Sequence, residues 1–273
     1  MKNKIVVLDF DGTLTQVKEE AKPFLKSFKK DYANFLSKDN LDKEWEEIEK
    51  EILKNPEQYG WKDKGLIIAP AKVDDYILAS VVAQVLLDKY DVFKKDKERD
   101  EIVHQIFRQN YLKSKICFKK EAKEVLEKLI KKLPVFIVTN SRPDAVLNKI
   151  QVLNPLGKEK LKIFGEAQKN WLDANFDLVP EFIKIQGLER KIYLRRKRYY
   201  DVLNQIWEQS SVKPEQCLIV GDVFELDLVL PAKLGCNIFL ITNSQTPDYE
   251  KQAVKDLFKG YVSEDIRDIL KVI

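Results

Sequence analysis

Two acidic residues near the start of the chain, Asp9 and Asp11, are the first candidates for chemistry. They follow the apolar run Ile5–Leu8, and Gly12 and Thr13 come directly after them. Such a run predicts a buried parallel strand, whose carboxyl end is where open α/β sheets bind ligands. Side chains alternate along a strand, so both carboxylates share one side, and like charges held together require a cation or a shared proton. Mg²⁺, which prefers carboxylate and phosphate oxygens, is the cation that this pattern favours.

Polar residues follow two further predicted strands in the same way. Thr139 and Asn140 come after Val135–Val138, and Asp222 comes after Cys217–Val220. Because the carboxyl ends of parallel strands meet at one edge, we expect these groups to gather with the first acids. Carboxylates, a hydroxyl and free backbone N–H groups are what phosphoryl transfer requires. Taken singly, each residue has a plain alternative as a turn or surface residue.

The same chemistry needs a fixed cation near the phosphoryl group. Lys197, which opens the helix predicted before the Cys217–Val220 strand, is our candidate. It lies within the basic run Arg195–Arg198, and such runs are usually solvated faces or, less often, nucleic-acid contacts. Lys191 and Lys184 therefore remain open as alternatives.

Strand and helix patterns alternate over most of the chain, which predicts an α/β fold with a doubly wound parallel sheet. The expected strands are Ile5–Leu8, Val135–Val138, Leu161–Phe164, Cys217–Val220 and Ile238–Ile241. The expected helices between the later strands are Lys120–Lys132, Pro143–Leu153, Tyr199–Gln209 and Leu226–Leu234. A β-hairpin is expected from Phe182–Ile185 and Lys191–Leu194, in a segment (about 170–196) that is either a specificity element or a surface elaboration.

The stretch between Gln16 and Phe118 breaks this alternation, because only helical periodicity is visible there. The expected helices are Glu20–Ser37, Leu41–Lys54, Lys72–Tyr90 and Lys97–Ser114. We therefore divide the chain into a core, residues 1–15 and 118–273, and an inserted, mainly α-helical domain, residues 16–117. Within the insert, Trp61 lies in a glycine- and lysine-containing loop outside the helical pattern, which makes it a candidate substrate contact.

Together these motifs resemble those of the haloacid dehalogenase (HAD) superfamily phosphatases. The first motif is Asp9-Phe10-Asp11-Gly12-Thr13, the second is Phe136-Ile137-Val138-Thr139, and the fourth is Gly221-Asp222 followed by Asp227. The third motif is a single lysine, assigned to Lys197 although Arg198 stands where proline is usual. The resemblance covers about residues 1–15 and 118–273 and implies a Rossmann-like core. The position of the insert is similar to that of the C1-type cap domain.

The resemblance implies a Mg²⁺-dependent phosphatase that hydrolyses a small phosphate monoester through an aspartyl-phosphate on Asp9. Asp11 would protonate the leaving oxygen and then take a proton from water. The implied metal ligands are Asp9, Asp11 through its backbone carbonyl, and Asp222. The other implied roles are Thr139, Asn140 and Gly12 on the phosphoryl group, Lys197 as its counter-charge, and Asp227 beside the lysine or a metal-bound water. Apart from the resemblance, Arg142 follows the second motif and is either a substrate contact, like Trp61, or a surface residue at a helix start.

Asp11 also separates the activities within this superfamily. Halide needs no proton to leave, whereas an alkoxide does, so an acid at this position favours phosphate ester hydrolysis over dehalogenation. Sugar phosphomutase and phosphonate-cleaving activities remain open, as does a non-catalytic member that binds a phosphorylated ligand or a protein.

Composition sets the expected partners and compartment. The 48 basic and 44 acidic residues leave a net charge of only +4, which is not the balance of a nucleic-acid-binding protein. The three cysteines are far apart, which argues for a reducing compartment, and the single histidine excludes most His-dependent catalytic triads. The longest apolar stretch, Tyr76–Leu87, is too short to span a bilayer. We expect a cytoplasmic protein that acts on a small phosphorylated metabolite, without a nucleic-acid or membrane partner.

Overall fold

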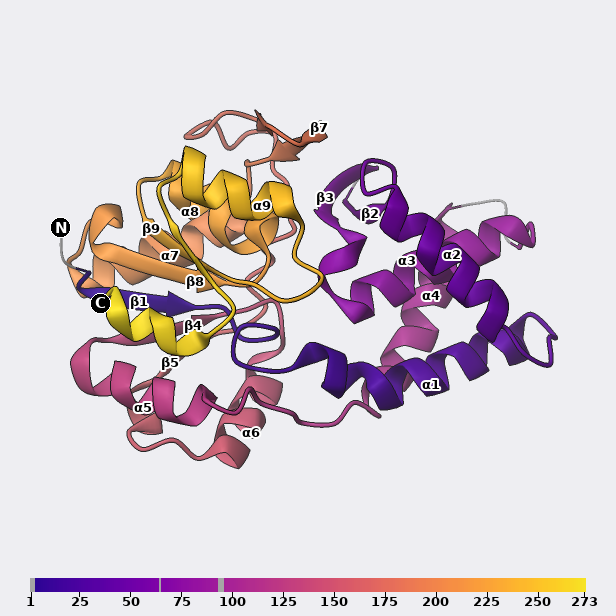
Figure 1. Cartoon of the computed structure of the whole chain (residues 1–273), viewed down its shortest axis with the longest axis horizontal. Coiled ribbons are helices and arrows are strands. Elements are labelled where there is room, and N and C mark those ends of the chain that lie inside the picture. The colour runs from indigo at the N-terminus through magenta and orange to yellow at the C-terminus, as the bar shows by residue number, and fades with distance from the viewer. Residues whose placement is uncertain (1–2, 64, 93–95) are drawn as a thin grey trace. The chain divides into compact units, whose positions relative to one another are not determined.

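The computed structural model describes residues 3–63, 65–92 and 96–273 (Figure 1). The chain forms two compact units: unit 1 comprises Met1–Gln16, Asp63–Ala69 and Phe118–Ile273, and unit 2 comprises Val17–Lys62 and Pro70–Cys117. The outer boundaries lie within one residue of those expected. The difference is Asp63–Ala69, which we had placed in the insert and which packs as part of unit 1.

Unit 1 contains a six-stranded parallel sheet, which confirms the predicted α/β fold. The strand order is β10-β9-β8-β1-β4-β5. The strands are β1 (Ile5–Leu8), β4 (Val135–Val138), β5 (Lys162–Phe164), β8 (Cys217–Gly221), β9 (Asn237–Ile241) and β10 (Tyr261–Ser263). In the centre of the sheet, Val7 of β1 is in register with Phe136 of β4 and with Ile219 of β8. The edge strand β10 was not predicted, because it has three residues and an exposed tyrosine.

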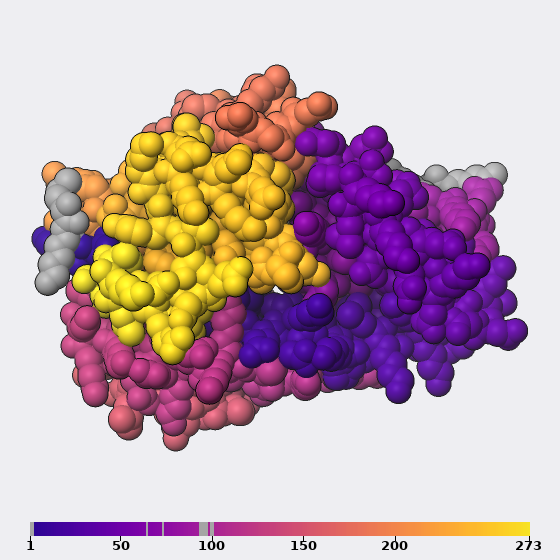
Figure 2. Space-filling view, in the orientation of Figure 1, coloured from indigo at the N-terminus to yellow at the C-terminus, as the bar shows by residue number. Residues whose placement is uncertain are grey.

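Helices cover both faces of this sheet (Figure 1). One face packs on α7 (Lys197–Ser210), α8 (Val229–Lys233) and α9 (Asp248–Gln252). The other packs on α5 (Ala122–Lys132), α6 (Pro143–Leu153) and the 3₁₀ helix η6 (Ile266–Lys271). In the space-filling view, the C-terminal segment (yellow) forms much of the visible surface of unit 1 (Figure 2). Ile5 and Val7 face the first set and Val6 and Leu8 the second, so both sides of β1 are buried and its run is continuously apolar.

The helix predicted over Leu226–Leu234 is divided in two. Its first part is the π-helical turn η4 (Phe224–Leu228), in which the Val229 N–H donates to the Phe224 carbonyl, and α8 follows. π-Helical turns are rare and occur often at functional sites. A second one is η5 (Ala253–Leu257), and the remaining 3₁₀ helices are η1 (Ala71–Val73), η2 (Lys158–Lys160) and η3 (Pro214–Gln216).

Two hairpins accompany the main elements. The hairpin predicted near residue 187 is confirmed as β6 (Phe182–Ile185) paired with β7 (Leu188–Tyr193). Its turn is shorter than expected, because Gly187 adopts a left-handed φ of +83° that allows a tight reversal. The second hairpin, β2 (Gly60–Asp63) and β3 (Leu66–Pro70), contradicts our expectation that the insert contains no strand. Trp61 therefore lies on a strand, not in a loop.

Unit 2 is built on the four expected helices: α1 (Val17–Phe35), α2 (Asp42–Lys54), α3 (Asp75–Lys89) and α4 (Asp96–Tyr111). They enclose an aromatic core in which Phe28 packs against Tyr32 and Trp45. α3 starts three residues later than predicted, because the Asp74 carboxylate accepts hydrogen bonds from the Tyr76 and Ile77 amides and caps the helix there. Among the helices that the structure describes, none has the length and apolar character needed to cross a membrane.

Candidate active site

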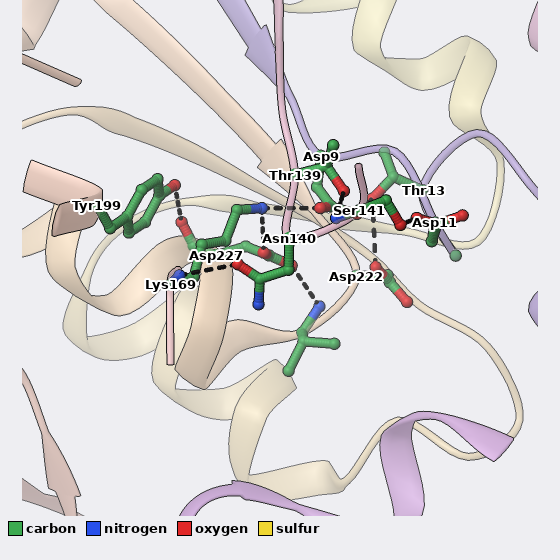
Figure 3. Close-up of polar contacts among 12 residues, drawn as sticks. Asp9, Asp11, Thr13, Thr139, Asn140, Ser141, Lys169, Tyr199, Asp222 and Asp227 are labelled. Atoms are coloured by element: carbon green, nitrogen blue, oxygen red, sulfur yellow. Dashed lines mark hydrogen bonds and ion pairs between the residues drawn. The ribbon is translucent and has the colours of Figure 1, made fainter. Parts of the chain in front are cut away.

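A buried lysine, Lys169, joins two of the predicted acidic residues. Its amine donates to Asp9 Oδ1 at 2.7 Å and to Asp227 Oδ1 at 2.8 Å, and only 2% of its side chain is exposed (Figure 3). Burial alone lowers the pKa of Lys169, but the negative charges of Asp227 and Asp9 outweigh it and raise that pKa above its ordinary value. Lys169 is therefore a fixed cation at the carboxyl end of β1.

Asp9 is poorly solvated even with this partner. Burial raises the pKa of Asp9 to about 7, the charge of Lys169 opposes the rise, and the charge of Asp227 adds to it. A carboxyl group with such a pKa is a candidate functional group, because a modest gain of positive charge beside it converts it to the carboxylate at neutral pH.

The loop before Lys169 has an unusual backbone. Glu166 and Gln168 both have positive φ, 50° and 48°, although neither is glycine. Non-glycine residues in this region cost free energy and persist only where their surroundings hold them. The Lys169 amide donates to Asn140 Oδ1 at 2.8 Å, and the Glu166 amide donates to the Ser141 carbonyl at 2.9 Å. The loops after β4 and β5 are thus fastened to each other.

Asp222 lies against the turn that follows Asp9. A Cβ on Gly12 would meet Asp222 Oδ2 at 2.0 Å, and Gly12 has a left-handed φ of +85°. Only glycine satisfies both conditions, so this residue sets how closely the first and fourth motifs approach. The Thr13 hydroxyl lies 3.2 Å from Asp9 Oδ2 and 3.3 Å from Asp222 Oδ1 (Figure 3). A hydroxyl has one hydrogen, so it donates to one of these carboxylates at a time.

Both carboxylate oxygens of Asp227 accept hydrogen bonds. Oδ1 accepts from Lys169, Oδ2 accepts from the Val223 amide at 3.0 Å, and the Asp227 carbonyl accepts from the Tyr199 hydroxyl at 2.8 Å. One oxygen from each of Asp9, Asp222 and Asp227 lies within 4.8 Å of the others, a spacing that could hold a metal ion. Because both Asp227 oxygens are already bonded, its arrangement fits a residue that positions Lys169.

Asp11 is held by groups from α6 and the loop before it. Asp11 Oδ2 accepts from Ser141 Oγ at 2.6 Å and Oδ1 accepts from the Lys149 amine at 2.9 Å. Thr139 is buried at the end of β4, and its hydroxyl oxygen accepts from the Ser141 amide at 3.1 Å. Thr139, Asn140 and Asp11 therefore belong to one connected group beside Asp9 (Figure 3).

The remaining expected site residues are Lys197, Arg142 and Trp61. The Lys197 amine pairs with Asp201 at 2.5 Å on the surface of α7, so the prediction that it contacts these carboxylates is corrected. The Arg142 guanidinium pairs with Asp144 and is 73% exposed. Trp61 is half-buried on β2 and belongs to unit 2.

Lys169 was not predicted, because the lysine was assigned by its distance before the fourth motif, and that distance pointed to Lys197 in the basic run. A usable signal was present. Lys169 follows the predicted strand that ends at Phe164, and the loop after a parallel strand opens at the same sheet edge as Asp9. Ser141 follows Thr139 and Asn140 at the same predicted strand end but was assigned no role, and Lys149 gave no sequence signal.

Comparison with known proteins adds an independent line of evidence. The family model of the haloacid dehalogenase-like hydrolases matches residues 3–235. No curated protein matches the chain. Similar solved structures include the HAD-hydrolase YfnB from Bacillus subtilis, bound to magnesium (11% identity, 100% of this chain and 99% of that one, TM-score 0.55). A second is a predicted phosphoglycolate phosphatase from Haemophilus somnus (13% identity, 100% of this chain and 98% of that one, TM-score 0.57). A third is a HAD phosphatase from Thermococcus onnurineus (16% identity, 100% of this chain and 97% of that one, TM-score 0.52).

At these identities the structural neighbours establish the fold alone. The family match covers residues 3–235 and includes the loops of Asp9, Thr139, Lys169 and Asp222, which are the loops that the structure gathers at one sheet edge. This chain belongs to the haloacid dehalogenase-like hydrolase family.

Proposed function

We propose that this protein is a Mg²⁺-dependent phosphatase that hydrolyses a small phosphate monoester through an aspartyl-phosphate on Asp9. The observation that carries the proposal is the contact of Lys169 with Asp9, at 2.7 Å in a buried setting. A fixed ammonium beside a carboxylate nucleophile neutralises charge on a phosphoryl group as it is transferred. The family relationship and the phosphatase neighbours are consistent with this reading.

The residues around Asp9 fit a magnesium ion. Asp9 Oδ2 and Asp222 Oδ1 both lie within hydrogen-bond distance of the Thr13 hydroxyl, so two buried carboxylates approach each other closely. Two neighbouring carboxylates, in a donor set made of oxygens, suit a hard divalent cation. Asp9, Asp222 and the backbone carbonyl of Asp11 would hold the ion. When bound, it would neutralise phosphate oxygens and favour the ionised form of Asp9.

The residues of the chain then divide the reaction between two steps. In the first, an Asp9 carboxylate oxygen forms a bond to phosphorus, the bond between phosphorus and the ester oxygen breaks, and Asp11 gives its proton to the departing alkoxide. In the second, Asp11 takes a proton from water, the water oxygen bonds to phosphorus, and the acyl phosphate bond breaks to release Asp9 and phosphate. Lys169 stays protonated throughout and interacts with the phosphoryl oxygens.

Two further features support this choice of reaction and substrate. An acid at Asp11 is needed to protonate an alkoxide but not a halide, which favours a phosphate ester over a haloacid. About a hundred residues are inserted into the core after β1, and most of them form unit 2. A lid domain inserted there would restrict the size of the substrate. A small phosphorylated metabolite is therefore the proposed substrate class.

Hydrolysis of para-nitrophenyl phosphate, measured with Mg²⁺ and with excess EDTA, tests the proposal. We expect turnover only with Mg²⁺ and loss of turnover in Asp9→Asn. Asp201→Asn is the matched control, because it makes the same change on the surface of α7. If the wild-type protein binds Mg²⁺ but turns over no phosphate ester, the protein is instead a phospho-ligand-binding member of the family.

A further inference from the structure

Arg196 is a fully buried arginine next to, but outside, the group of residues around Asp9. Its side chain has 0% exposure. Its guanidinium donates to the Lys169 carbonyl at 2.6 Å, to the Ile68 carbonyl at 2.9 Å and to the Tyr193 carbonyl at 3.2 Å. All three acceptors in these hydrogen bonds are backbone groups from different segments, so Arg196 joins the Lys169 loop, β3 and the end of β7.

Burying the Arg196 guanidinium costs free energy, which suggests that the side chain has a role that an apolar residue could not fill. A buried guanidinium loses its hydration, and each of its N–H groups must find a partner in the interior. Backbone carbonyls carry partial charges only, so they compensate the loss less well than a carboxylate does. The three hydrogen bonds are charge-assisted and reach three separate segments, so one guanidinium connects the Lys169 loop, β3 and the end of β7.

The segment that ends at Lys169 needs such support. Glu166 and Gln168 hold left-handed conformations, and the side chain of Lys169 must reach both Asp9 and Asp227. The Lys169 amide is fixed from one side by Asn140, and its carbonyl is fixed from the other side by Arg196. Fixing the two peptide groups on either side of the Lys169 Cα determines where that Cα is placed, and it restricts where the amine can lie.

A second hydrogen bond connects the same two segments. The Leu172 amide donates to Asp63 Oδ2 at 3.3 Å. Asp63 and Ile68 both lie in the segment Asp63–Ala69, which is part of unit 1 but is continuous in the chain with unit 2 at both of its ends. The loop of Lys169 is thus bonded to the segment Asp63–Ala69 at two nearby positions, at Lys169 through Arg196 and at Leu172 through Asp63.

We infer that Arg196 is a positioning residue that fastens the Lys169 loop to the β3 segment of the insert and thereby holds the Lys169 amine between Asp9 and Asp227. This inference deepens the proposed function, since it rests on Lys169 acting on the phosphoryl group. It predicts that a substitution which removes the hydrogen bonds of Arg196 or Asp63 lets the Lys169 side chain move, although neither residue contacts Asp9 or Asp222 in the hydrogen bonds described above.

Chemical acetylation of Lys169, followed by mass spectrometry of the native protein, tests the placement directly. In wild type the amine is buried and ion-paired, and we expect slow acetylation. In Arg196→Gln we expect the rate at Lys169 to rise about tenfold or more because the loop opens locally, with a smaller rise in Arg196→Lys. Arg195→Gln is the matched control, because the Arg195 guanidinium donates to the Ala174 carbonyl instead, and it should leave the rate unchanged.

Asp63 supplies a test that does not depend on a buried arginine. Asp63→Ala removes the acceptor of the Leu172 amide and should also expose Lys169, whereas Asp63→Asn keeps an acceptor oxygen and should not. If Arg196→Gln does not fold, Arg196→Lys and Asp63→Ala decide the question. Acetylation of Lys169 at the wild-type rate in the folded variants overturns the inference.

Kinetics distinguishes positioning from a general loss of stability. In Arg196→Lys we expect kcat on para-nitrophenyl phosphate to fall ~10–100-fold while KM changes by less than about threefold, because a displaced catalytic group costs rate more than binding. Equal changes in kcat and KM, or none, contradict the role assigned to Arg196. If acetylation rises as expected but wild type shows no phosphatase activity, the placement stands and the proposed function fails.

Discussion

The Lys169 amine and the Asp9 carboxylate meet at 2.7 Å although 160 positions separate them in the chain. The contact places a permanent positive charge at the end of β1, on the residue that we propose becomes phosphorylated. Asp227 completes the arrangement by accepting a hydrogen bond from the same amine at 2.8 Å. The proposed chemistry therefore depends on a lysine that no short sequence motif marks.

Replacing Lys169 by methionine should remove the counter-charge while keeping much of the side-chain volume. We expect kcat to fall ~10²–10³-fold, as it does when one preorganised donor to a transition-state oxyanion is lost. Lys197→Met is the matched control, because Lys197 pairs with Asp201 at the surface and its loss should change kcat by less than about twofold. Steady-state kinetics on both variants checks this, and a larger effect for Lys197→Met would reverse the assignment of the lysine.

Gly12→Ala should damage metal binding in particular. A Cβ at Gly12 would lie 2.0 Å from Asp222 Oδ2, so the Asp222 carboxylate or the Gly12 turn must shift from its present position. Gly235→Ala offers a control, since Gly235 also has a left-handed φ, of +97°, but has open space around its Cβ position. Both changes should cost about 1–2 kcal/mol of stability from backbone strain. Only Gly12→Ala should raise the Mg²⁺ concentration for half-maximal activity, and equal Mg²⁺ requirements in the two variants would contradict the proposed ligand set.

Asp11→Asn should discriminate between leaving groups. The amide cannot donate an acidic proton, so kcat/KM for an alkyl phosphate should fall ~10²–10⁴-fold, which is the range for loss of a general acid. para-Nitrophenolate leaves without protonation, so kcat/KM for its phosphate ester should fall much less. Asp144→Asn, which alters an exposed acid paired with Arg142, should affect neither substrate. If Asp11→Asn slows both substrates equally, Asp11 does not act as the acid.

Magnesium affinity should depend on pH through Asp9. Burial raises the pKa of Asp9 to about 7, so at pH 6 most of this carboxyl is protonated in the metal-free protein. Mg²⁺ must displace that proton, and its apparent affinity should therefore fall by up to about tenfold per pH unit below 7 and level off above it. Calorimetric titration at pH 6 and pH 8 measures this. The Asp9→Asn variant should bind Mg²⁺ more weakly, and its Mg²⁺ affinity should no longer change with pH. Equal Mg²⁺ affinity of the wild-type protein at pH 6 and pH 8 would contradict the role assigned to Asp9.

The sequence predicted the sheet well because its central strands are buried on both faces. Val6 and Val7 point to opposite sides and both reach a core, which produces the continuous apolar runs that identify such strands. The positions of Asp9, Asp222 and Thr139 followed directly, since each residue comes at the end of such a strand. The hairpin of β2 and β3 was missed because it is short and lies among strongly helical segments.

The rest of the site could not be read from the sequence because it depends on loops. Lys169 reaches Asp9 only through the left-handed backbone at Glu166 and Gln168 and through bonds to Asn140 and Arg196. Local sequence patterns indicate strands and helices, and they do not encode such tertiary hydrogen bonds. Lys197, by contrast, had a plausible position in the sequence but forms an ordinary surface ion pair one turn along α7.

Detection of a phosphoryl group on Asp9 tests the central claim most directly. The protein is mixed with Mg²⁺ and a rapidly cleaved phosphate ester, quenched in acid within the first turnover and analysed by peptide mass spectrometry. We predict a mass increase of one phosphoryl group on the peptide that contains Asp9, located at that residue, and its absence from Asp9→Asn. Turnover of the substrate with no phosphoryl group on that peptide at any quench time, or with full activity in Asp9→Asn, would contradict the account.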